Sequence, residues 1–135
     1  MLRSRFQRKL LEVLFDGADE ASGDVAAAAE RYFASIAAAR DLITLPADPK
    51  AASSLAGTYR SDALGTIEVR RDEARVVFDF GGFESEVASK QNDDGTTSFV
   101  TTTPGNSGCE FVLRDGGAAL VTRDSQHEYV FAAAP

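Results

Sequence analysis

The segment Leu55–Val69, LAGTYRSDALGTIEV, marks the point at which the apolar period of this chain changes. After Gly57 apolar and polar residues alternate, and Ile67 and Val69 are separated by a charged residue. A period of two is typical of a β-strand with one buried face. The segment therefore predicts that a β-sheet begins here and that the chain before it has another structure.

Strand-like segments continue from this point to the C-terminus. Val76, Phe78 and Phe80 repeat the alternation. Turn-forming residues recur about every ten positions, at 71–73, 81–82, 92–95, 104–108, 114–117 and 123–126. This spacing predicts roughly eight short strands.

The connections between these strands are short, which favours an antiparallel meander because parallel strands need long crossovers. Eight such strands can close into a small barrel, and a β-sandwich is the alternative architecture. Phenylalanines at positions 78, 80, 83, 99, 111 and 131 are expected to point inward and to fill the interior. The predicted fold class is α+β, mainly β, with helices before the barrel.

Upstream of Pro46 the apolar period is that of helices. One face of a first helix carries Leu2, Phe6, Leu10, Val13 and Leu14, and Gly17 is its expected end. This apolar stripe can fold back on the barrel, pair with a second copy or fray in water. Of these outcomes we expect self-association through these five residues. The flanking basic residues are interpreted as the solvated face of the same helix.

Two further helical segments are expected before the strands. An alanine-rich helix begins at Ser22 or Asp24, either of which can serve as its N-cap. Asp48-Pro49 has the pattern of an N-cap followed by proline at the first helical position, and Gly57 is the expected end of this short turn.

The composition limits the classes of function. The chain has 135 residues, a net charge of −7 and a pI near 4.6, which argues against nucleic acid as a general partner. No apolar run approaches the ~18 residues of a membrane span, and no signal peptide is recognisable. The single cysteine, Cys109, is expected on a strand as a buried small hydrophobe.

No residue set with the spacing of a catalytic or metal site is present. The motifs Ser-x-x-Lys and Gly-x-Ser-x-Gly are missing, as are the glycine-rich phosphate loops and paired-cysteine metal spacings. We therefore predict no catalytic residue, no metal and no cofactor. The candidate binding residues are Tyr59, Arg123 and His127, because they lie next to predicted strand ends, where contacts usually gather.

Several segments together resemble the C-terminal part of bacterial serine hydrolases of the β-lactamase-related, penicillin-binding-protein-like family. The helices RFQRKLLEVLFDG and DVAAAAERYFASIAAAR, the joint LPADP and the segment LAGTYRSDALGTIEVRR carry the resemblance. FDFGGFESEVASK, DGTTSFVTT and RDSQHEYVF extend it to the C-terminus. In such proteins a catalytic domain carries the serine, and a small lipocalin-like barrel follows it.

The resemblance implies a division of the chain into three parts. Residues 1–16 look like the last helix of an upstream catalytic domain, residues 17–54 like a helical linker, and residues 55–135 like the barrel. It implies a non-catalytic accessory domain that packs on or shapes the cleft of a catalytic domain in the same polypeptide. The alternative is an independent lipocalin-like domain that binds a small ligand. The compartment depends on a targeting signal that would precede Met1.

Overall fold

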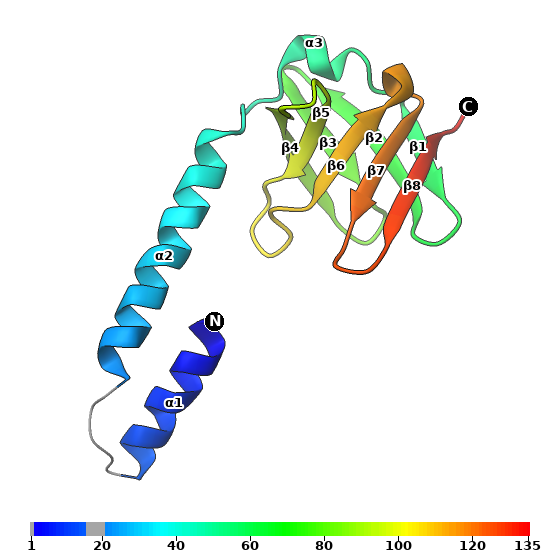
Figure 1. The fold of residues 1–135 in the computed structure, drawn as a ribbon. Coiled ribbons are helices and arrows are strands. Elements are labelled where there is room, and N and C mark those ends of the chain that lie inside the picture. Colours follow the sequence, from blue (N-terminus) through cyan, green and yellow to red (C-terminus); the bar gives the residue numbers. More distant parts are fainter. Residues whose placement is uncertain (1, 16–20) are drawn as a thin grey trace. The chain divides into compact units, whose positions relative to one another are not determined.

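The computed structural model of the protein describes residues 2–15 and 21–135. The chain divides into two compact units, Met1–Asp41 and Leu42–Pro135 (Figure 1). The first unit contains the helices α1 (Leu2–Leu14) and α2 (Ser22–Asp41). The second contains the short helix α3 (Pro49–Ala52) and all the strands.

The two long helices form for the reasons seen in the sequence. The alanines of α2 favour helix, and α2 begins at Ser22, the first of the two predicted starts. The Ala21 carbonyl accepts the first helical bond, from the Val25 amide, so Ser22 and Asp24 lie inside the helix and neither is the predicted N-cap. The expected end of α1, Gly17, lies outside the described residues. The helices are joined by polar contacts: an ion pair of 2.7 Å between Arg5 and Asp24, and a 3.1 Å bond from the Ala21 amide to the Glu12 carboxylate.

Eight strands follow α3 in an unbroken meander. They are β1 (Thr58–Ser61), β2 (Gly65–Asp72), β3 (Arg75–Asp79), β4 (Glu84–Gln91), β5 (Thr97–Thr101), β6 (Glu110–Arg114), β7 (Ala119–Arg123) and β8 (Glu128–Ala133). A short 3₁₀ turn, Asp115–Gly117, connects β6 to β7. Each strand pairs antiparallel with the next, and β8 pairs with β1 through Tyr59↔Ala133 and Arg60↔Ala132. The predicted meander and closed barrel are confirmed, and the β-sandwich alternative is wrong.

The barrel interior is packed with aromatic and branched side chains. On β3, Val76 and Phe78 are buried, whereas Asp79 between the inward positions 78 and 80 is partly exposed. The ring of Phe78 lies 5.9 Å from that of Phe99 and 5.8 Å from that of Phe111, within the range of aromatic pairs. These contacts place the hydrophobic core inside the closed sheet.

Of the six predicted core phenylalanines, four are buried, one is half-buried and one is exposed. Phe83 is 43% exposed, because it lies in the β3–β4 connection rather than on a strand, and it stacks on the half-buried Phe80 at 4.6 Å. The alternation of β3 therefore stops at Phe80. The prediction that Phe83 points into the core is wrong, since the residues 81 and 82 form the turn that reverses the chain.

The helix α3 begins as the sequence predicts. The Asp48 carboxylate accepts a 2.8 Å bond from the Lys50 amide, and Pro49 occupies the first turn. The helix ends at Ala52 instead of continuing to Gly57. The residues between them, including the buried Leu55, are part of the closure described below.

Candidate functional site

The segment Thr44–Ala56 closes one end of the barrel, and we call it the strap. It lies at the end where the β2–β3, β4–β5 and β6–β7 connections are found (Figure 1). Three strap residues, Ala47, Ala52 and Leu55, are buried in the barrel core. The strap is therefore part of the packing of the second unit.

Backbone and side-chain hydrogen bonds attach the strap to β4. The Thr44 and Ser89 backbones exchange bonds of 2.8 Å and 3.0 Å. The buried Ser89 hydroxyl also accepts a 2.9 Å bond from the Asp48 amide. These contacts join positions about forty residues apart, which a local sequence pattern cannot reveal.

Arg71 attaches the strap to β2. Its Nη2 donates to the carbonyl oxygens of Ala52 at 3.0 Å and of Leu55 at 2.8 Å. Ala52 is the last residue of α3, and its carbonyl oxygen also accepts a 3.1 Å bond from the Leu55 amide. Sequence analysis did not identify Arg71 as a contact of the strap, although its place in the strand alternation could have indicated one. It shares the strand face of Ile67 and Val69, which predicts an inward-directed arginine at the end of β2.

Tyr59 joins the strap to the β6–β7 turn. Its side chain is fully buried, and its hydroxyl accepts a 2.9 Å bond from the Ala56 amide and donates a 2.7 Å bond to the Gly117 carbonyl. Burial raises the pKa of Tyr59, while the bond from Ala56 and the charge of Arg71 lower it to a smaller extent. The Tyr59 hydroxyl therefore has both a donor and an acceptor as partners within the protein.

Gly117 allows the β6–β7 turn to approach the strap. Its φ is +105°, and a β-carbon placed there would lie 1.8 Å from the Ser54 carbonyl oxygen. No other residue type can occupy that space without moving the backbone. Sequence analysis identified the glycine pair 116–117 only as a turn.

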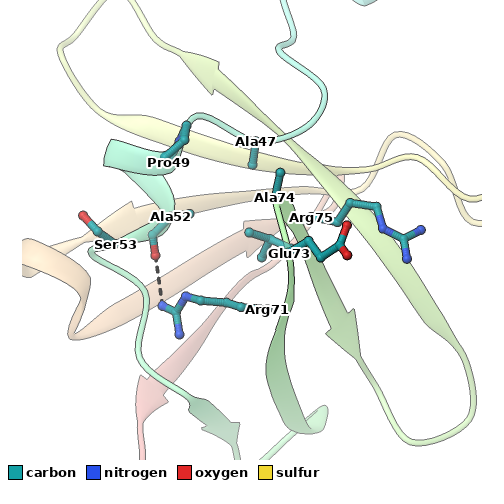
Figure 2. A pocket seen from close by; sticks show the side chains of 9 residues that line it. Ala47, Pro49, Ala52, Ser53, Arg71, Glu73, Ala74 and Arg75 are labelled. Atoms are coloured by element: carbon teal, nitrogen blue, oxygen red, sulfur yellow. Dashed lines mark hydrogen bonds between the residues drawn. The ribbon is translucent and has the colours of Figure 1, made fainter.

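A small pocket lies between the strap and the β2–β3 hairpin (Figure 2). Its volume is about 250 Å³, and its lining includes Ala47, Pro49, Ala52, Arg71 and Glu73. Figure 2 shows the bond from Arg71 to the Ala52 carbonyl. The one hydroxyl in the lining, that of Ser53, donates to the Lys50 carbonyl at 2.7 Å and contacts no base. The pocket therefore lacks the pair of groups that nucleophilic catalysis needs.

Two of the predicted binding residues, Arg123 and His127, lie at the end of the barrel opposite the strap. Arg123 ends β7 and forms an ion pair with Glu128 across the β7–β8 connection. The backbone amides of Gln126 and His127 both donate to Asp124, which lowers the pKa of that carboxyl. The His127 ring is 3.8 Å from the same carboxylate.

The three predicted binding residues are therefore not brought together. Tyr59 is buried under the strap, whereas Arg123 and His127 are exposed side chains at the opposite end. Tyr59 is occupied by two structural hydrogen bonds. Arg123 forms an ion pair with Glu128, and the His127 ring lies beside Asp124 in the same hairpin. Binding by any of them stays a prediction.

A second groove runs over the outer surface of β6 and β7. Its volume is about 620 Å³, its floor includes Val112 and Val121, and Glu110, Arg114 and Arg123 flank it. The charges have both signs, so the groove favours neither an anion nor a cation. Cys109 lies at its edge.

Cys109 corrects a sequence prediction, because it is exposed rather than buried. It precedes β6, which begins at Glu110, and therefore belongs to the β5–β6 connection. Among the contacts of the described residues, none joins Cys109 to His127. The two residues provide no nucleophile and base pair.

The described part of the chain contains no group of three or more His, Cys, Asp or Glu side chains that could hold a metal ion. Among the described helices, none is long and apolar enough to cross a membrane. Exposed large apolar side chains are found on α1 and α2, at Leu42, at Leu45 in the strap and at Val130 on β8. They are also found at the end of the barrel opposite the strap (the strapless end), where Leu64 is 51% exposed. Comparisons of the chain with protein-family models, curated proteins and solved structures give no match.

Proposed function

We propose that the chain is a non-catalytic accessory domain of a β-lactamase-related serine hydrolase, the family that it resembles in sequence. In this proposal it packs on a catalytic domain of the same polypeptide and shapes the cleft of that domain. The observation that carries the proposal is a barrel with a packed interior and one end closed by a strap, in which the described residues form no nucleophile and base pair.

The strapless end of the barrel is the surface that we assign to contact with the catalytic domain. The β1–β2 connection carries Leu64, and the β3–β4 connection carries Phe83, which is stacked on Phe80. Exposed apolar side chains on connecting loops are frequent at protein contacts. Loops on a rigid barrel can position such side chains at the rim of a neighbouring cleft.

The alternative function, an independent lipocalin-like binder of a small ligand, would need space inside the barrel. Small barrels either hold a ligand or are filled by their own side chains. Here Tyr59, Phe78, Phe99 and Leu120 are fully buried in the interior. The packing supports the accessory function over the binding function.

The proposal is tested by the coding sequence upstream of Met1 and by a binding measurement. We expect an open reading frame that encodes a domain with a Ser-x-x-Lys motif. That domain, produced separately, should bind this chain, and Phe83→Ser should weaken binding at least ~tenfold because it removes an apolar contact. The matched control is Val77→Ser on the outer face of β3, away from the strapless end. A stop codon directly upstream, or equal binding by both variants, would contradict the proposal.

A further inference from the structure

We draw no further inference here: the strongest candidate, the groove over the outer surface of β6 and β7 beside the exposed Cys109, is flanked by charges of both signs, and nothing in the structure shows what covers it.

Discussion

At the scale of single residues, Tyr59 shows how a side chain near a strand end can serve the fold. The sequence-based hypothesis was that Tyr59 contacts a ligand, since it is amphipathic and close to a predicted loop. In the structure its ring is in the core, and its hydroxyl links Ala56 of the strap to Gly117 of the β6–β7 turn. A buried tyrosine usually has a partner for its hydroxyl, and here it has two.

Replacement of Tyr59 by phenylalanine should lower the free energy of unfolding by about 1–3 kcal/mol, since two buried backbone groups lose their partner. The matched control is Tyr129→Phe, whose hydroxyl is 3.4 Å from the exposed Asp124 and whose loss should cost less than about 0.5 kcal/mol. Urea titration of both variants measures the difference. Equal effects would show that the link to the strap does not stabilise the fold.

The Tyr59→Phe variant should also change how the free energy of unfolding depends on pH in alkaline solution. The pKa of Tyr59 is raised in the folded chain above the value of 10.0 for an unfolded tyrosine. The unfolded chain therefore loses this proton first, and the stabilising effect, complete below pH 10, is lost as the pH rises through the folded pKa. Tyr59→Phe should show a smaller loss of stability above pH 10 than the wild type.

At the scale of elements, the strap differs from the strands in what holds it. The strands pair with their neighbours along the chain through backbone ladders. The strap is attached by individual hydrogen bonds to Ser89 on β4 and to Arg71 on β2. The Tyr59 hydroxyl links it to Gly117. At Gly117 the turn lies so near the strap that the Ser54 carbonyl oxygen occupies the space that a β-carbon would need.

Gly117→Ala should displace the strap and destabilise the barrel by about 2 kcal/mol or more, through a backbone overlap and an unfavourable φ. The control is Gly116→Ala in the same turn, where φ is +64° and the added β-carbon meets nothing within 4 Å. That change should cost only about 1 kcal/mol. Hydrogen exchange at the Ala56 amide should become faster in Gly117→Ala and not in Gly116→Ala. The reverse order would contradict the proposed contact.

At the scale of the whole molecule, the helical unit and the barrel unit have opposite distributions of apolar side chains. The barrel places most of them inside, whereas α1 and α2 expose Phe6, Leu10, Tyr32 and Phe33. The barrel therefore has a packed core, whereas the helical unit leaves several large apolar side chains exposed.

The whole chain should not hydrolyse a chromogenic β-lactam or a p-nitrophenyl ester. The reason is that the hydroxyls of Ser53 and Ser85 contact backbone groups, and that of Ser98 contacts the side-chain amide of Asn92, instead of a base. Steady-state assays of purified protein measure this, with Cys109→Ser and His127→Ala as controls for the one exposed thiol and the one histidine. Turnover that survives repurification and is lost in either variant would contradict the prediction.

The sequence by itself determined the order of the elements, the antiparallel meander and the start of α3. These features depend on residues close together in the chain: alternation within a strand, turn residues between strands, and Asp48 beside Pro49. Local patterns were less reliable at the ends of elements. Phe83 and Cys109 adjoin strand-like segments, yet both lie in connections and are exposed.

Only the tertiary structure decided that the strap closes the barrel, that Tyr59 is buried beneath it, and that most of the apolar stripe of α1 is exposed. Tyr59 and Gly117 are 58 positions apart, and Asp48 and Ser89 are 41 apart. Such pairs meet only when the sheet closes into a barrel, because closure brings the strand ends and the strap to the same place. Periodicity shows which residues share a face of an element, but the packing of elements decides what that face contacts.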